Sequence, residues 1–324
     1  MSDLDAYRVV PMNRVDPFPS EEERAKHVFE VAVVERPSPG LDEATLRKPR
    51  EQVRLGLEKI AAAFGAAVID RSRPGFDTLR SDRPRSEFEG VDAEVVPSGD
   101  FALSARFTTL RHAAVWTPPT KLPWQSEEDV AKKPGTCTHT AEVTFDVELV
   151  RKGWEDQIER IYLLNHKAVQ ENKDLDRACT ISPVTIDTLI ETATAEALSC
   201  LEIPLGTRIS PRGFVLAHRK SKEGESHIYK VSLGLEHGVD PEEPLEFRRV
   251  ERFDQSDGTQ LRRERVIATG VATTQITPDT TWVAVNLDDV KTEILEGDLV
   301  KRYFQKGLLT NLTGPDCKKI LAER

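Results

Sequence analysis

The sequence predicts an α/β protein, with helices packed on a mixed sheet, followed by a small all-β, barrel-like domain. Three patterns point to this class: a strand, a helix and a strand within residues 28–72, two alternating segments between residues 101 and 149, and a series of short strands after Gly213. The chain has 324 residues, of which 38% are hydrophobic. That length and composition allow about two domains with conventional cores.

The first helix is predicted between two short apolar strands at residues 28–34 and 66–70, which suit the interior of a sheet. The apolar residues between them recur with the period of a helix: Val53, Leu57, Ile60, Ala61 and Phe64. Gly65 ends this helix, as glycine commonly does. We expect the helix to begin close to Lys48, because Pro49 is tolerated only near a helix start.

Alternating apolar and polar residues predict two long half-buried strands at residues 101–107 and 143–149. The segment between them, residues 117–135, is polar and proline-rich, so we expect an exposed loop that joins antiparallel neighbours. A third strand is predicted within residues 158–166.

A second helix is predicted at residues 183–201, with Ser182 as its N-cap and a proline at its first position. Proline and glycine then mark a change of composition, and we place a domain boundary near residue 209. The predicted divisions are an irregular lead-in at 1–25, an α/β domain at 26–209, a small β domain at 210–306, and a tail at 307–324 that adds a terminal helix.

Six short strands are predicted in the small β domain: residues 214–218, 227–233, 245–253, 261–269, 281–285 and 298–303. Asp257 and Gly258 predict a tight hairpin between the third and fourth of them. The Arg and Glu residues on those two strands are interpreted as a solvated face with cross-strand ion pairs, rather than as a binding patch.

Charge and hydropathy argue against two classes of partner. The net charge is -10 and the pI about 5.4, so a general affinity for nucleic acid is not expected. No apolar run reaches the roughly 18 residues of a transmembrane helix, and the segment after Met1 lacks the features of a signal peptide. The protein is therefore cytoplasmic if Met1 is the native start, or a leader has been removed.

The four cysteines, Cys137, Cys179, Cys200 and Cys317, are too few and too scattered to form a disulfide framework in a chain of this size, and they do not fix the redox compartment. Cys137 lies two residues from His139, but no second half of a metal site is visible. We interpret both as structural residues and predict no metal.

Catalytic and phosphate-binding motifs are also missing, so we predict no catalytic residue and no cofactor. The basic residues 47–50 are interpreted as surface residues rather than as an anion site. The candidates for a ligand pocket are Asp70, Arg71, Ser72 and Asp100, which we expect at the carboxyl ends of strands, where open α/β sheets bind ligands.

The order of elements resembles the CsgG-type fold, which is shared by the curli secretion channel lipoprotein, the TolB amino-terminal domain and the penicillin-binding-protein activator lipoproteins. The resemblance covers residues 28–209 and rests on the strand ending at residues 68–72, the segment 90–101, the long hairpin, and the alanine-rich helix at 192–198. The segment 230–247 is similar to the small carboxy-terminal β-domain of the flagellar ring protein FlgT.

This resemblance implies a non-enzymatic structural or assembly component of a bacterial envelope machine. It implies a ring or scaffold subunit that binds copies of itself and other envelope proteins, located in the periplasm or at the outer membrane. Membrane association would be peripheral or through a lipid anchor, although the lipidated amino-terminal cysteine of the curli channel is missing here. The alternatives are a soluble small-ligand-binding protein or enzyme with a pocket at the strand ends, and a cytosolic interaction protein on the same fold.

Overall fold

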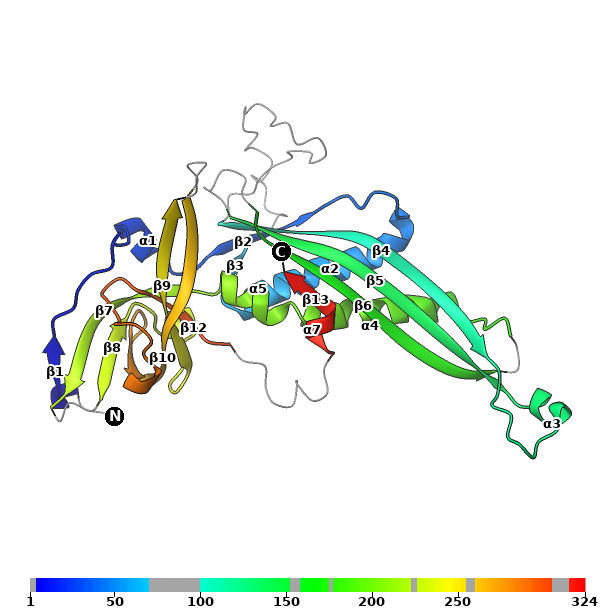
Figure 1. Cartoon of the computed structure of the whole chain (residues 1–324). Helices are drawn as coiled ribbons and strands as arrows, with labels where there is room; N and C mark the ends of the chain where they lie inside the picture. The colour runs from blue at the N-terminus through cyan, green and yellow to red at the C-terminus, as the bar shows by residue number, and fades with distance from the viewer. Residues whose placement is uncertain are drawn as a thin grey trace, which may run out of the picture. The chain divides into compact units, whose positions relative to one another are not determined.

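The computed structural model describes residues 4–69, 100–151, 158–174, 177–222, 226–254, 260–304 and 315–323, which fall into two compact units (Figure 1). The long-sheet unit takes Val31–Ile60, Val68–Pro204 and Gly307–Arg324. The barrel unit takes Met1–Glu30, Ala61–Ala67 and Leu205–Lys306. Each unit thus combines segments that are far apart in the sequence. The predicted boundary near residue 209 stays a prediction.

The long-sheet unit is built on a six-stranded sheet with the order β13-β6-β5-β4-β2-β3. Its strands are β2 (Glu30–Glu35), β3 (Ala67–Val68), β4 (Phe101–Thr117), β5 (Gly135–Arg151), β6 (Ile158–Asp174) and β13 (Leu321–Glu323). β2 runs parallel to β4, whereas β4, β5 and β6 are antiparallel neighbours and β13 is antiparallel to β6. The predicted loop between β4 and β5 is confirmed, and it contains the short helix α3 (Glu127–Ala131).

Two helices lie side by side on one face of this sheet, α2 (Glu43–Ala63) and α4 (Pro183–Ser199) (Figure 1). α4 contacts β5 and β6. Its predicted N-cap is confirmed, because Ser182 Oγ accepts a hydrogen bond of 3.1 Å from the Thr185 backbone. Beneath it, alternate residues of β5 are fully buried: Val143, Phe145, Val147 and Leu149. The short helix α5 (Glu202–Ile209) follows α4.

The start of α2 differs from the prediction, because the helix begins at Glu43 and places Pro49 inside it. Asp42 explains the earlier start, since its carboxylate accepts hydrogen bonds from both the backbone N–H and the hydroxyl of Thr45. Such a side chain satisfies amide groups that would otherwise lack a partner in the first turn.

Two disulfide bonds hold the long-sheet unit, Cys137–Cys179 and Cys200–Cys317, and no cysteine is free. The expectation that the cysteines form no disulfide framework was therefore wrong. The partners are 42 and 117 residues apart in the sequence. Only the tertiary fold brings them together, so their spacing carried no signal.

The barrel unit contains six antiparallel strands that close into a barrel in the order β7-β12-β9-β10-β11-β8, with β8 returning to β7. These strands are β7 (Arg212–Ser221), β8 (His227–Val231), β9 (Pro244–Asp254), β10 (Gln260–Ile276), β11 (Thr281–Val285) and β12 (Leu299–Arg302). Their inner faces form one apolar core, which includes Val231, Leu245, Phe247, Ile267 and Val283. Three-residue 3₁₀ turns lie at Leu235–His237 and Leu287–Asp289.

The lead-in, which we expected to be irregular, contributes to the barrel unit. After a 3₁₀ turn at Leu4–Ala6, β1 (Tyr7–Val10) pairs antiparallel with residues 218–221 of β7. α1 (Glu21–Ala25) follows, with Ser20 and Glu23 forming a capping box. The tail also differs from the prediction, because its helix α7 is limited to Cys317–Ile320 and gives way to β13.

The predicted fold class, α/β, is wrong, because strand outweighs helix in the described part of the chain, 43% against 27%, and the C-terminal part contains a closed six-stranded antiparallel barrel. The sequence pattern underestimated the length of the strands, because apolar and polar residues alternate clearly only where one face of the sheet packs on a core. β4 and β6 each continue well beyond that region, to a length of 17 residues.

Candidate functional site

The strongest candidate site is the outer part of the long sheet, which we call the distal sheet. It comprises residues 108–117 of β4, 135–144 of β5 and 165–173 of β6. These are the far ends of the three long curved strands in Figure 1, on the side of the loop that carries α3. The sequence missed this site because it predicted that the first and third strands end near residues 107 and 166.

The outer edge of β4 is covered only along its first part. β2 pairs with β4 as far as Ala105, and Ser38 Oγ accepts a hydrogen bond of 3.0 Å from the backbone N–H of Phe107. Beyond Phe107, no strand in the described part of the chain pairs with this edge. Among the described residues, this edge therefore presents a row of unpaired backbone groups, on which another strand can add.

The outer edge of β6 is covered in a similar way. β13 pairs with residues 162–164 of β6, and its first residue, Leu321, lies opposite Leu164. From Asn165 to Lys173, β6 has no further strand neighbour on this side among the described residues. Because β4 and β6 both run antiparallel to β5, the two open edges run in the same direction.

The two covers end at the same level of the sheet. Phe107 lies opposite Phe145 on β5, and Phe145 lies opposite Leu164 on β6. The open edges therefore start level with each other, and they stay level out to Thr117 and Lys173. The distal sheet thus has one open edge on each side, and the two edges match in length and direction.

A row of charged side chains crosses one face of the sheet where the distal part begins. Glu142 on β5 forms ion pairs with Arg111 on β4 and Lys167 on β6. The hydrogen bond from Arg111 lowers the pKa of Glu142, so this row stays paired in mild acid. Beyond it, residues 113–117 of β4 contain no charged residue and no proline, which are the usual protections of an open edge.

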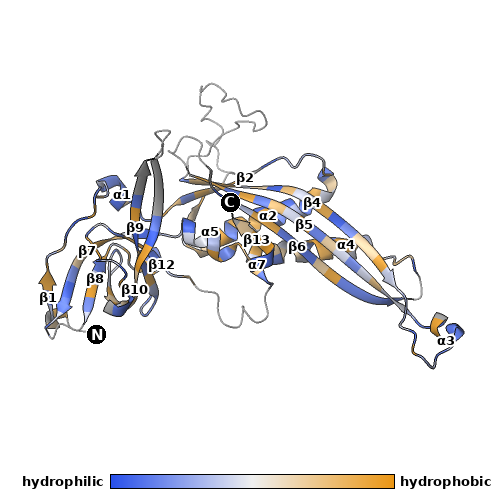
Figure 2. Cartoon of the chain, viewed as in Figure 1, coloured by the Kyte–Doolittle hydropathy of each residue, from blue (hydrophilic) through white to orange (hydrophobic). Residues whose placement is uncertain are grey.

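Two β-branched side chains are exposed beside the open edges. Val115 on β4 is 60% exposed and Val169 on β6 is 57% exposed. Both lie on the face that points away from α4. Val115 is opposite Thr138 of β5, and Val169 is opposite Thr140 of β5. The far end of β4 is accordingly apolar in Figure 2. Val115 therefore lies on an edge segment that lacks charges and can favour strand addition, whereas Lys167 and Glu171 flank Val169 on β6.

The helix-side face of the distal sheet buries nitrogen atoms that have no hydrogen-bond partner among the described residues. These atoms are His112 Nε2, His139 Nδ1 and Trp116 Nε1. The two histidine rings stack at 5.6 Å, and Arg177 lies 5.0 Å from the centre of the Trp116 ring. Burial lowers the pKa of His112, and a charge on His139 would lower it further. The buried environment therefore disfavours protonation of His112.

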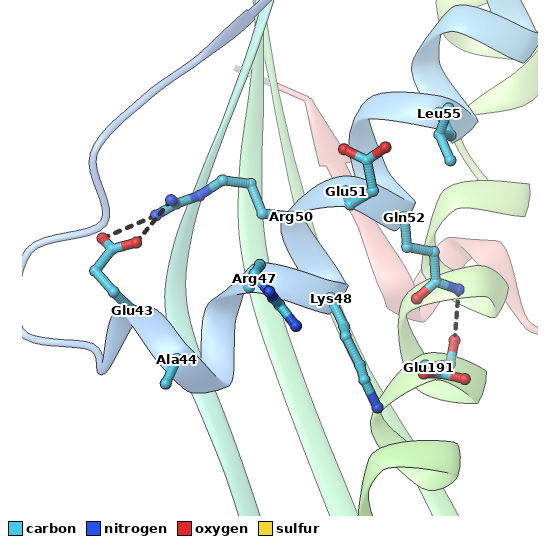
Figure 3. Close-up of a pocket in the computed structure, with 9 residues that line it drawn as sticks. All are labelled: Glu43, Ala44, Arg47, Lys48, Arg50, Glu51, Gln52, Leu55 and Glu191. Atoms are coloured by element: carbon cyan, nitrogen blue, oxygen red, sulfur yellow. Dashed lines mark hydrogen bonds and ion pairs between the residues drawn. The ribbon is translucent and has the colours of Figure 1, made fainter.

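A second candidate is a groove of about 1010 Å³ between α2 and α4 (Figure 3). Its polar groups are largely bonded to one another. Lys48 Nζ lies 2.7 Å from Asp187, and Gln52 donates a hydrogen bond of 2.9 Å to the Glu191 carbonyl. Arg50 forms an ion pair with Glu43. Arg47, Lys48 and Arg50, next to Pro49, thus line this groove, and they lie inside α2 rather than at its start.

The predicted ligand pocket stays a prediction, because only one of its four residues lies in the described part of the chain. Asp70, Arg71 and Ser72 lie outside the described residues. Asp100 directly precedes β4 and so lies at the amino end of that strand, not at a carboxyl end.

A charged cluster on the barrel unit also differs from its prediction. Cross-strand ion pairs are present, since Glu264 of β10 binds Arg248 of β9 and Lys301 of β12. However, Lys301 is 4% exposed and Glu246 is 7% exposed, so this part of the surface is not solvated. Burial acts to raise the pKa of Glu264, but the nearby cations outweigh it and hold that pKa at about 2. The cluster is a paired structural element.

The described residues contain no group of three or more His, Cys, Asp or Glu side chains that could hold a metal ion. None of the described helices combines the length and apolar character needed to cross a membrane. No protein-family model and no curated protein sequence matches this chain.

Proposed function

We propose that the chain is a non-enzymatic structural subunit of a bacterial envelope assembly, and that copies associate through the open edges of β4 and β6. The observation that carries this proposal is the pair of open edges, one on each side of the sheet, which match in length. β4 of one copy can pair with β6 of the next if the second copy is turned over, so that the two strands run antiparallel and their covered halves point away from each other. Such head-to-tail contacts generate a ring if the rotation closes, or an open filament if it does not.

The two disulfides support an envelope location. All four cysteines are paired, although the chain is large enough to be stable without such bonds. Disulfides form and persist in oxidising compartments such as the bacterial periplasm, and they are rare in the cytosol. The resemblance to the CsgG-type envelope proteins points to the same compartment.

The proposed interface is tested by placing a charge on one edge at a time. We expect Val115→Lys and Val169→Lys each to abolish self-association, because a lysine on an edge strand opposes pairing. The matched control is Val9→Lys, which changes a 70% exposed valine on β1. Light scattering at high protein concentration measures the mass of each variant, and thermal unfolding checks that each is folded.

Mixing the two edge variants distinguishes this interface from a symmetric one. Each variant keeps one usable edge, so an equal mixture should stop at two copies, with about twice the mass of the 36.3 kDa chain. If the unmodified protein has the mass of one copy at every concentration, or if both edge variants associate normally, the proposal is wrong.

The groove between α2 and α4 supports a second candidate, a small-ligand-binding protein. Its volume lies near the upper end of the range for ligand pockets. A ligand that fills the groove should raise the melting temperature of the unmodified protein by mass action, and a metabolite panel tests this. The control is Gln52→Leu, which removes the hydrogen bond to the Glu191 carbonyl inside the groove and should reduce the shift.

A further inference from the structure

The loop between β4 and β5 carries a tryptophan on a tight turn. The backbone N–H of Gln125 donates a hydrogen bond of 3.0 Å to the Leu122 carbonyl, which closes a β-turn with Pro123 and Trp124 as its central residues. Proline favours the first of these two positions. The side-chain oxygen of Gln125 also accepts a hydrogen bond from the Leu122 N–H. The position of Trp124 is therefore fixed by a turn that is bonded at both ends.

The side chain of Trp124 lies in solvent. Trp124 is 78% exposed, the highest exposed fraction among the large apolar residues that the structure describes, and Leu122 in the same turn is 39% exposed. In Figure 1 this loop and α3 lie beyond the ends of β4 and β5, away from the other elements of the long-sheet unit. Both side chains are therefore available to a partner outside the unit.

The backbone near Trp124 has few free hydrogen-bond donors. Three of the eight residues from Thr117 to Trp124 are prolines, which have no N–H group. The N–H groups of Leu122 and Gln125 are bonded within the turn. A backbone donor that enters an apolar layer without a partner costs free energy, so a loop with few such donors enters that layer more easily.

The charges next to the turn cancel. Residues 112–134 contain three lysines and three acidic residues, so this end is neutral, although the net charge of the whole chain is -10. Lys121 pairs with Glu127 at 3.3 Å, and Lys132 pairs with Glu128 at 3.1 Å. A neutral surface offers no long-range attraction to an acidic or a basic partner. Binding at this tip therefore depends on the apolar side chains and on the indole N–H.

We propose that residues 122–125 form a peripheral membrane anchor, which places Trp124 and Leu122 at the interface of a bilayer with zwitterionic headgroups. Such an interface offers a protruding ring both an apolar layer and hydrogen-bond acceptors, and it requires no matching shape. The inference goes beyond the proposed pairing of β4 with β6, because one copy carries the whole turn. An assembly of several copies would bind more strongly than one copy, since its anchors act together.

Vesicles of phosphatidylcholine and phosphatidylethanolamine test the anchor on the full chain. We expect the unmodified protein to sediment with them, and brominated acyl chains to quench its tryptophan emission. Trp124→Ala and Leu122→Asp should each lower the partition coefficient by about tenfold, because each removes apolar area from the bilayer. The matched control is Leu235→Asp, which places the same charge at a 53% exposed leucine of the barrel unit and should leave binding unchanged.

A conservative variant separates insertion from a change in folding. Trp124→Phe keeps a ring that can insert, so it should bind better than Trp124→Ala, but it should lose most of the quenching. If vesicles are not bound at millimolar lipid, or if Trp124→Ala binds as well as the unmodified protein, the anchor is wrong. If Trp124→Ala instead lowers the mass of the assembly in light scattering and the unmodified protein ignores vesicles, the turn binds another copy and the anchor is wrong.

The same measurements distinguish the anchor from the proposed function. If the unmodified protein binds vesicles through this turn but has the mass of one copy at every concentration, the anchor stands and the proposed self-association is wrong. If it self-associates but ignores vesicles, the anchor is wrong and self-association stands.

Discussion

At the scale of single residues, Glu264 couples the stability of the barrel unit to pH. Its pKa is about 2 in the folded chain and about 4.5 in an ordinary setting. A carboxylate with a depressed pKa stabilises the fold above its unfolded pKa, and this stabilisation is lost as the pH falls. We expect the free energy of unfolding to fall between about pH 4.5 and 2, by roughly 3 kcal/mol from this group.

Glu264→Gln tests this coupling in denaturant titrations. The variant should lose roughly 3–5 kcal/mol at pH 7, because it removes the carboxylate that pairs with both the buried Lys301 and Arg248. It should also lose its share of the acid dependence. The control is Glu251→Gln, which breaks a more exposed cross-strand pair with Arg265 and should cost less than about 1 kcal/mol. Equal losses in both variants would contradict the role assigned to burial.

At the scale of elements, the cap of α4 gives a prediction of its own. Ser182→Ala removes the acceptor for the Thr185 backbone N–H and should cost about 1 kcal/mol, measured by the shift of the denaturation midpoint. Ser182→Asp keeps an acceptor at this position and should retain most of the stability. If Ser182→Asp lost as much stability as Ser182→Ala, the hydroxyl of Ser182 would act through something other than capping.

The Cys137–Cys179 disulfide should stabilise the distal sheet by constraining the unfolded chain. It closes a loop of about 42 residues, for which chain entropy gives about 3–4 kcal/mol. Cys137→Ser/Cys179→Ser should lower the free energy of unfolding by that amount, while Thr136→Ser/Thr180→Ser next to the cysteines should leave it nearly unchanged. Hydrogen exchange should then rise first in residues 135–144 of β5.

Elements with a local physical cause were predictable from the sequence. Ser182 and Pro183 mark the start of α4 through their own backbone chemistry, and the prolines between β4 and β5 mark a loop. The disulfide pairs and the open edges depend on which strands become neighbours, and no local pattern records that. Asp100 shows the same limit, because its sequence position did not reveal which end of the sheet it occupies.

At the scale of the whole molecule, the barrel unit depends on the first strand of the chain. β1 pairs with residues 218–221 of β7, and Arg219 donates a hydrogen bond of 3.1 Å to the Leu4 carbonyl. Removing residues 1–10 should destabilise the barrel unit by roughly 1–4 kcal/mol, counting four cross-strand pairs. Hydrogen exchange should rise in residues 218–221 and not in β5. Val9→Lys, which keeps the backbone pairing, should leave that exchange low.

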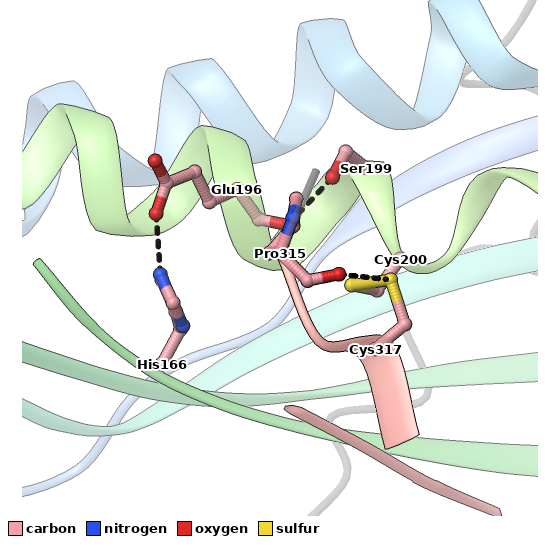
Figure 4. The surroundings of a disulfide bond; sticks show 6 residues. All are labelled: His166, Glu196, Ser199, Cys200, Pro315 and Cys317. Carbon is pink, nitrogen blue, oxygen red and sulfur yellow. Dashed lines mark hydrogen bonds and ion pairs between the residues drawn. A yellow bond between two sulfur atoms is a disulfide. The ribbon is translucent and has the colours of Figure 1, made fainter. Parts of the chain in front are cut away.

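The position of Cys317 also imposes an order of events during synthesis. Its partner, Cys200 (Figure 4), is made 117 residues earlier, and the strands of the barrel unit are translated in between. During this time β6 has its full outer edge exposed, because β13 does not yet exist. Each new chain therefore passes through a period in which wrong neighbours can pair with β6, and a binding factor that shields this edge would act then.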